Sequence, residues 1–174
     1  GTSRTGSTIA AVSFTFSGMM VTQIVHHIVM QTLSLFPFEL IAVELAIRKN
    51  KPWIMMLLAF VVGAQLLVGF YQIVLYSLIV VVLYGVGRLW MQSTTLKEKL
   101  ALGGTMAAAI ALGFGIGALQ LVPSIEFTLR SNRSTGVSQS DVWQYPYPLV
   151  HFITFLWPYL LGDPRRGTYP AFSD

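Results

Sequence analysis

Long apolar stretches separated by short polar breaks run along most of the chain. We assign membrane-spanning helices to five of them, at residues 8–22, 33–47, 53–69, 73–90 and 100–121. Polar or charged residues lie at their ends, as expected where a helix leaves the hydrocarbon core. The pattern therefore predicts an all-α fold, a polytopic transmembrane helix bundle with about five spanning helices plus interfacial or re-entrant helices.

The third and fourth of these stretches follow each other closely. One continuous helix from Trp53 to Trp90 would be about 57 Å long at 1.5 Å per residue. That is nearly twice the hydrocarbon thickness of about 30 Å. We therefore expect the chain to turn at residues 69–72, where the polar break Gly-Phe-Tyr-Gln occurs.

Two shorter segments do not fit a spanning helix. Residues 23–31 are amphipathic and include His26 and His27, which favours a short helix lying in the membrane interface. Residues 149–161 form a short apolar segment that contains a proline, and we expect it to be re-entrant or interfacial. The polar residues 123–148 are predicted to form a long outer loop.

Three polar side chains inside the predicted spans need partners. Glu44 precedes Arg48 by four residues, the spacing that favours an ion pair on a helix surface. Glu39 has no such partner in the sequence and needs a polar neighbour from another helix. Gln65 is expected to form an interhelical hydrogen bond, worth about 0.6–2 kcal/mol.

Small residues recur at every fourth position along the predicted span at 100–121. They are Ala101, Thr105, Ala109, Gly113 and Gly117. Such a ridge lets a neighbouring helix approach closely, and its last step is a GxxxG motif. A glycine-rich phosphate loop is disfavoured here, because the surrounding sequence is helical and apolar.

The same span is predicted to end at Pro123. Glu126, Arg130 and Arg133 follow in quick succession, and an arginine at the centre of a membrane helix costs roughly 2.5–3.5 kcal/mol. We therefore expect the chain to reach the membrane surface at about Pro123.

Composition supports the membrane assignment. The 174 residues are 54% hydrophobic and 10% charged, with a mean hydropathy of +0.65, whereas soluble domains carry about 25% charged residues. The net charge of +4 is spread over the loops, which argues against nucleic acid as a partner, and the absence of cysteine removes thiolate chemistry. Because the chain opens without Met and has no closing element, we expect residues 1–174 to be one internal fragment of a longer multi-pass domain.

The basic residues of the loops and helix ends predict an orientation. On a five-span path one side of the membrane receives Arg4, the cluster at 48–51, Arg88, Lys97 and Lys99. The positive-inside rule makes that side cytoplasmic. The opposite face then collects the histidine pair, the turn at 69–72 and the loop that contains the arginines.

This opposite face supplies the candidate substrate-binding residues. They are His27, Gln72, Gln120, Glu126, Arg130 and Arg133. Arginine binds phosphate through a planar, bidentate fork, and Arg130 and Arg133 share a face if the chain is helical there. One phosphate of a membrane lipid would then contact both. The alternative is that these charges are ordinary interfacial anchors.

The residues indicate neither a metal site nor a catalytic base. His26 and His27 are adjacent, so on a helix they point about 100° apart and cannot easily bind one ion. Glu126 and Asp141 are acids on the predicted outer face, but nothing in the pattern marks either as catalytic. The pattern assigns no cofactor.

Four groups of short motifs follow one another along the chain. They are Phe16-Ser-Gly18 with His26-His27 and Phe36-Pro37-Phe38; Gly69-Phe-Tyr-Gln72; Gln120-Leu-Val-Pro-Ser-Ile-Glu126 with Ser131-Asn-Arg133; and Leu156-Trp-Pro158-Tyr-Leu-Leu-Gly162-Asp163. In order and spacing they resemble the YfhO family of bacterial multi-pass membrane proteins, within the GT-C glycosyltransferase superfamily. The turn at 69–72 departs from that family, which usually has Gly-His-Pro-Gln there.

The resemblance implies a function on the extracytoplasmic face of a bacterial cell membrane. It implies transfer of a sugar from a polyprenyl-phosphate carrier, held among membrane lipids, to a cell-envelope acceptor such as a glycan or a teichoic-acid-type polymer. The catalytic acid of such enzymes lies in the first extracytoplasmic loop, which we expect upstream of this fragment. A non-catalytic transporter or flippase of lipid-linked sugars is the alternative, and an internal repeat of the five-span unit would favour it.

Overall fold

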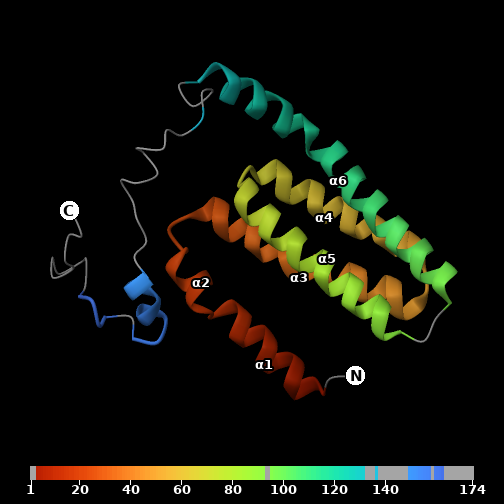
Figure 1. Cartoon of the computed structure of the whole chain (residues 1–174), viewed down its shortest axis with the longest axis horizontal. Coiled ribbons are helices and arrows are strands. Elements are labelled where there is room, and N and C mark those ends of the chain that lie inside the picture. The colour runs from red at the N-terminus through yellow and green to blue at the C-terminus, as the bar shows by residue number, and fades with distance from the viewer. Residues whose placement is uncertain (1–2, 93–94, 132–135, 137–148, 158, 163–174) are drawn as a thin grey trace. The chain divides into compact units, whose positions relative to one another are not determined.

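The computed structural model describes residues 3–92, 95–131, 136, 149–157 and 159–162. Every regular element within these ranges is helical, which confirms the all-α prediction (Figure 1). The chain divides into two compact units, residues 1–127 and 128–174, and each is described by itself.

The helices differ widely in length. The α-helices are α1 (Arg4–Thr15), α2 (Gly18–Thr22), α3 (His27–Lys49), α4 (Met55–Val68), α5 (Tyr71–Met91) and α6 (Leu96–Arg130), and the 3-10 helices are η1 (Pro52–Ile54) and η2 (Leu149–Phe155). Three of them, α3, α5 and α6, are long and apolar enough to cross a membrane. With 23 and 21 residues, α3 and α5 are about 32–35 Å long, which matches a hydrocarbon core of about 30 Å.

These three helices indicate a multi-pass membrane protein. A shorter apolar helix, Pro52–Val68, combines η1 and α4 and lies between α3 and α5 in the sequence. Consecutive helices from α3 to α6 run in opposite directions and lie side by side (Figure 1).

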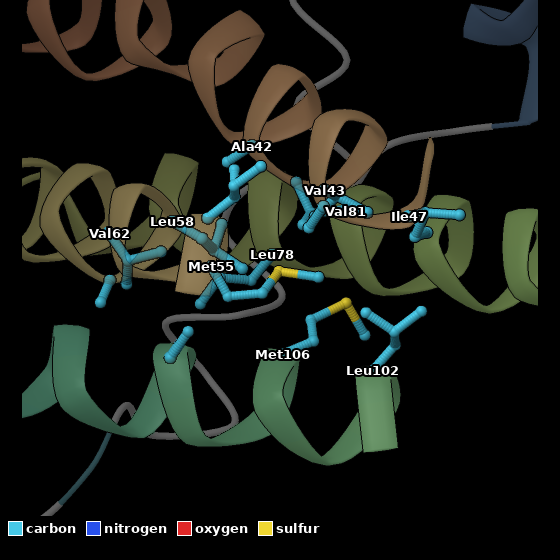
Figure 2. Close-up of a cluster of buried hydrophobic side chains, with 14 of the residues drawn as sticks. Ala42, Val43, Ile47, Met55, Leu58, Val62, Leu78, Val81, Leu102 and Met106 are labelled. Carbon is cyan, nitrogen blue, oxygen red and sulfur yellow. The ribbon is translucent and has the colours of Figure 1, made fainter. Parts of the chain in front are cut away.

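The core of the first unit lies between α3, α4 and α5. Val43 on α3, Leu58 on α4 and Val81 on α5 are completely buried. Leu102 and Met106 of α6 close this core from one side, as Figure 2 shows. The core therefore takes one apolar stripe from each of four helices, while many other large apolar side chains stay exposed, as expected for surfaces in lipid.

Two glycines of α6 bring this helix very close to α4. A Cβ atom added at Gly113 would lie 2.8 Å from Val62 Cβ, and one added at Gly117 would lie 2.5 Å from Leu66 Cβ. Both distances are too short for real Cβ contacts, so only glycine allows this approach. The prediction of a small-residue ridge is confirmed at these positions and at buried Ala109.

The ridge does not extend to the start of α6. Leu102 and Met106 are the buried residues there, whereas Ala101 is exposed. The close approach is also reciprocal, because a Cβ atom at Gly63 of α4 would lie 2.7 Å from Ile116 Cγ2 of α6. Large side chains of each helix thus fit against small residues of the other.

The turns between these helices use standard caps. Gly69 ends α4 with a φ of 91°, a left-handed conformation that favours glycine. The predicted turn is therefore confirmed at Gly69 and Phe70, whereas Tyr71 and Gln72 already belong to α5. At the start of α6, Glu98 Oε2 accepts from the Thr95 N–H (3.2 Å) and Thr95 Oγ1 accepts from the Glu98 N–H (3.3 Å). This reciprocal pair is a capping box, which fixes where the helix begins.

The predicted span at 8–22 is not one helix. The structure divides it into α1, which has 12 residues, and α2, which has 5. The break follows from Ser17, whose hydroxyl accepts the Met20 N–H and caps a new helix at Gly18. At about 18 Å, α1 is too short to span the hydrocarbon core.

The separate interfacial helix predicted at 23–31 is also wrong. Residues 27–31 are instead the first residues of α3, which begins at His27 rather than near Leu33. The polar residues that suggested an interface helix therefore extend the next spanning helix by more than one turn. Only the chain from Gln23 to His26 connects α2 to α3.

The prediction that the last helix ends at Pro123 is wrong as well. Helix α6 continues through Pro123 to Arg130, so residues 123–130 of the predicted loop are helical, and most of its other residues lie outside the described ranges. Proline removes one backbone hydrogen bond, but membrane helices tolerate this loss when nearby hydroxyls bond to the carbonyls around the proline. Ser124 and Tyr71 supply such hydroxyls at Gln120.

The second unit contains η2, within the segment at 149–161 that was predicted to be re-entrant or interfacial. Its seven residues extend about 14 Å at 2.0 Å per residue, which is too short to cross a bilayer. Leu149, Phe152 and Phe155 are exposed, and the two phenylalanine rings lie 6.0 Å apart. An interfacial position for this segment remains a prediction.

Candidate functional site

One end of the first unit gathers three of the predicted site segments. Because α3 to α6 alternate in direction, the start of α3, the turn at 69–72 and the later part of α6 lie at the same end (Figure 1). We call this the Gln120 end. The opposite, basic end carries Arg48, Lys49, Lys51, Arg88, Lys97 and Lys99 at helix ends or in turns.

The α4–α5 turn and α6 are in contact at the Gln120 end. A Cβ atom at Gly69 would lie 3.7 Å from Gln120 Nε2, so the Gln120 side chain lies beside the turn. The Ser124 hydroxyl donates to Gln120 O at 2.8 Å, and the Tyr71 hydroxyl lies 2.8 Å from Ser124 Oγ. Tyr71 also donates to Gln120 O over a longer distance of 3.5 Å.

Sequence reasoning missed Tyr71 and Ser124. Both lie within segments that were singled out, at 69–72 and beside Pro123, but neither was given a role. The position of Ser124 directly after a proline could have indicated its role. A proline leaves the preceding helical turn short of hydrogen-bond donors, and a nearby serine hydroxyl can donate to a carbonyl there. The partner from another helix could not be found from spacing alone.

The other predicted site residues remain solvent-accessible. Gln72 is exposed and donates to the Tyr76 hydroxyl on its own helix at 2.9 Å. His27 is exposed as the first residue of α3. The structure therefore brings Gln120 directly to the turn, while Gln72 and His27 share only the same end of the bundle.

Glu126 and Arg130 lie on the last turns of α6 and are exposed. They are four residues apart with the acid first, which is the favourable orientation for an ion pair on a helix. Arg133 lies outside the described residues, as do Asp141, Arg165 and Arg166. The predicted pairing of Arg130 with Arg133 on one phosphate is therefore untested.

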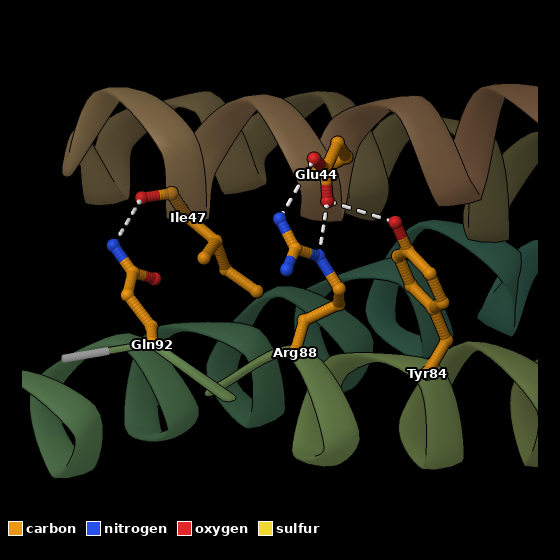
Figure 3. Close-up of polar contacts among 5 residues, drawn as sticks. All are labelled: Glu44, Ile47, Tyr84, Arg88 and Gln92. Atoms are coloured by element: carbon orange, nitrogen blue, oxygen red, sulfur yellow. Dashed lines mark hydrogen bonds and ion pairs between the residues drawn. The ribbon is translucent and has the colours of Figure 1, made fainter. Parts of the chain in front are cut away.

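A second polar group lies nearer the basic end, and it corrects the predicted Glu44–Arg48 pair. Glu44 instead receives two hydrogen bonds from Arg88, at 2.8 Å from Nε and 3.0 Å from the terminal nitrogen, and a third from the Tyr84 hydroxyl at 2.8 Å (Figure 3). The bidentate fork joins α3 to α5. Arg48 is exposed at the end of α3, so it has less need of a carboxylate partner.

A third polar group is buried between α3, α4 and α5. Gln65 donates to the Thr32 carbonyl at 3.1 Å, which confirms the predicted interhelical hydrogen bond. Ser77 of α5 donates to Gln65 Oε1 at 3.3 Å. Glu39 is beside Gln65 and Ser77, so the expectation that it needs a polar neighbour from another helix is met.

Glu39 lies deeper than the sequence suggested. The predicted span began at residue 33, whereas α3 begins at His27 and ends at Lys49. Glu39 is therefore twelve residues from one end and ten from the other, or about 18 Å and 15 Å along the helix axis. It occupies the middle of a helix long enough to cross the membrane.

Comparison of the chain with known protein families, curated proteins and solved structures gave no match. The described residues thus define the class of the protein by their own architecture, which is a multi-pass helical membrane protein. Its activity has to be inferred from the polar groups at the Gln120 end and inside the bundle.

Proposed function

We propose that this chain is part of a GT-C type membrane glycosyltransferase similar to the YfhO family. The enzyme would transfer a sugar from a polyprenyl-phosphate carrier to a cell-envelope glycan or teichoic-acid-type acceptor. The transfer would occur on the extracytoplasmic face of a bacterial cell membrane, at the Gln120 end of the bundle. We assign no catalytic acid among the described residues.

The observation that carries the proposal is the assembly of the Gln120 end. The motif segments at His27, 69–72 and Gln120–Glu126 are separated by tens of residues in the sequence, yet they reach one end of the first unit. The contact between Gln120 and the turn is direct. Segments that jointly form one substrate site must meet in this way, so their arrangement supports the resemblance.

The length of α6 supports a headgroup site at this end. The helix continues ten residues beyond Gln120 to Arg130, which adds about 15 Å along its axis. It thereby carries Glu126 and Arg130 away from the apolar bundle towards the level of lipid headgroups. Arginine at that height suits a carrier phosphate, because its planar fork makes charge-assisted hydrogen bonds to phosphate oxygens.

Binding of a short-chain polyprenyl phosphate to the purified protein in detergent tests the proposal. Arg130→Ala or Arg133→Ala should weaken binding by roughly 1.5–3 kcal/mol, the scale of a hydrogen bond to a charged group. Lysine at either position should restore binding only in part, because it lacks the paired donors. Lys49→Ala and Lys97→Ala, at the basic end, are the matched controls and should bind normally. Wild-type affinity in both arginine variants would reduce these residues to interfacial anchors.

A second candidate function is a transporter or flippase of lipid-linked sugars, which would use the same arginines without catalysing transfer. The buried Glu39 favours it, since ionisable residues in the middle of membrane helices often mark transport pathways. Reconstituted vesicles distinguish the two functions. Sugar appearing on an acceptor supports the transferase, whereas carrier crossing the bilayer without chemical change supports the transporter.

A further inference from the structure

Glu39 is a buried acid whose only neighbouring polar side chains in the described part of the chain are uncharged. Its side chain is completely buried, and neither carboxylate oxygen has a hydrogen-bond partner among the described residues. Two other polar side chains beside it, Gln65 and Ser77, are 0% and 5% exposed. An ionised carboxylate left in this position would incur a large desolvation penalty.

The two polar side chains beside Glu39 are hydrogen-bonded to other groups. The Gln65 amide nitrogen donates to Thr32 O, so its oxygen faces the other way, towards Ser77. The Ser77 hydroxyl lies 3.0 Å from Val74 O and 3.3 Å from Gln65 Oε1. Its single hydrogen is donated to one of these at a time. Gln65 Oε1 and Ser77 Oγ thus lie 3.3 Å apart, and both of these uncharged side chains are beside the Glu39 carboxyl group.

No protein cation in the described residues compensates the Glu39 charge. The guanidinium of Arg88 on α5 already forms a bidentate pair with Glu44. Glu44 is five residues further along α3, a rise of about 7.5 Å. The third ionisable group there, Tyr84, is also bonded to Glu44. The polar side chains facing Glu39 from α4 and α5, Gln65 and Ser77, carry no charge.

We propose that Glu39, Gln65 and Ser77 form a monovalent-cation site inside the membrane, occupied by a proton or a sodium ion. Both cations neutralise the carboxylate. A proton turns one Glu39 oxygen into a donor for the neighbouring oxygens, and a small hard cation prefers an all-oxygen set of ligands. The site goes beyond the proposed sugar transfer, because it lies inside the bundle rather than at the Gln120 end.

A groove on the first unit gives access to this site. It has a volume of about 210 Å³ and lies between α2, α3 and α5, with Ser77 in its lining. The other lining residues are apolar or aromatic, namely Met19, Leu33, Phe36, Ile73, Tyr76 and Val80. A hydrophobic reagent dissolved in the membrane can therefore approach Ser77 and, behind it, Glu39.

Labelling with a hydrophobic carbodiimide, which modifies protonated carboxyl groups in apolar surroundings, tests the proposal. The purified protein is treated in detergent over a range of pH, in sodium chloride and in choline chloride, and the modified residue is identified by mass spectrometry. We expect label at Glu39 that declines as the pH rises, and no label at this position in Glu39→Gln. Slower labelling in sodium, by the factor 1 + [Na⁺]/Kd, identifies a sodium site, and equal rates in both salts identify a proton site.

The infrared spectrum of the same samples provides a second measurement that does not depend on the carbodiimide reaching Glu39. A protonated Glu39 contributes a carboxyl C=O band that Glu39→Gln removes, and sodium bound at the site also removes it. Glu44→Gln is the matched control, because the Arg88-paired Glu44 carboxylate should contribute no such band. A protein with neither label nor a Glu39 carboxyl band in sodium-free buffer at any pH, and no effect of sodium on its spectrum, would overturn the proposal.

Discussion

Tyr71 is the side chain that joins the α4–α5 turn to α6 at the Gln120 end. Pro123 has no N–H, so the Leu119 carbonyl lacks its usual helix donor. The adjoining carbonyl of Gln120 accepts from the Ser124 hydroxyl and, at longer range, from Tyr71. The Tyr71–Ser124 hydrogen bond of 2.8 Å thus holds the turn against the part of α6 that contains the proline.

Removing the Tyr71 hydroxyl should weaken this connection. We expect Tyr71→Phe to lower the free energy of unfolding by about 0.5–1.5 kcal/mol, the usual worth of one intramolecular hydrogen bond, as measured by denaturation in detergent. Tyr76→Phe is the control, because its hydroxyl accepts only from exposed Gln72 on the same helix. Equal stability of the two variants would show that the Tyr71 contact contributes nothing.

Sequence spacing correctly indicated which polar side chains need partners, but it did not identify those partners. The four-residue spacing predicted that Glu44 pairs with Arg48, but the partner of Glu44 is Arg88, 44 residues later in the chain. Spacing describes one helix, whereas the choice between two arginines depends on which of them is nearer to water. Glu39 was correctly expected to need another helix, although which helix could not be deduced before α3, α4 and α5 were placed together.

At the scale of elements, the packing of α6 on α4 depends on two glycines. Gly113 and Gly117 face Val62 and Leu66 with no room for a Cβ atom. Gly115, between them, faces open space, with nothing within 4 Å of a Cβ atom placed there. The same helix therefore contains both the test positions and their internal control.

Leucine at Gly113 or Gly117 should force the two helices apart. We expect each variant to lose about 1–3 kcal/mol of stability, the cost of overpacking a close contact, with a lower yield of folded protein. Gly115→Ala should instead be neutral or gain up to about 1 kcal/mol, because alanine is the better helix former. Thermal unfolding of the three variants in detergent measures both effects. Unchanged unfolding of both leucine variants would mean that this face of α6 contacts lipid.

Element boundaries were predictable where a single residue decides the backbone. The turn at Gly69 was predictable, because a single helix from Trp53 to Trp90 would be too long for the membrane and glycine readily adopts a positive φ. The prediction of a helix end at Pro123 failed, because a membrane helix tolerates the loss of the one backbone hydrogen bond that a proline removes, and α6 continues through it to Arg130. The break at Ser17 followed from a local cap that the apolar pattern of 8–22 concealed.

At the scale of the whole molecule, the central claim is that the Gln120 end and the basic end face opposite sides of the membrane. Three helices long enough to span, together with the shorter helix formed by η1 and α4, carry the chain back and forth between these ends. The predicted count of five spans included the 8–22 segment, which is divided into α1 and α2. The positive-inside rule still predicts a cytoplasmic basic end, because losing the 8–22 span does not change which end of α3 to α6 is basic.

Single cysteines in this cysteine-free chain measure that arrangement directly. Asn50, at the basic end, and Phe127, on α6 beyond Gln120, are both exposed positions. With a membrane-impermeant maleimide on intact cells, Phe127→Cys should be labelled at once, and Asn50→Cys should be labelled only after the membrane is opened. Labelling of both from the outside, or of Asn50→Cys alone, would contradict an extracytoplasmic Gln120 end.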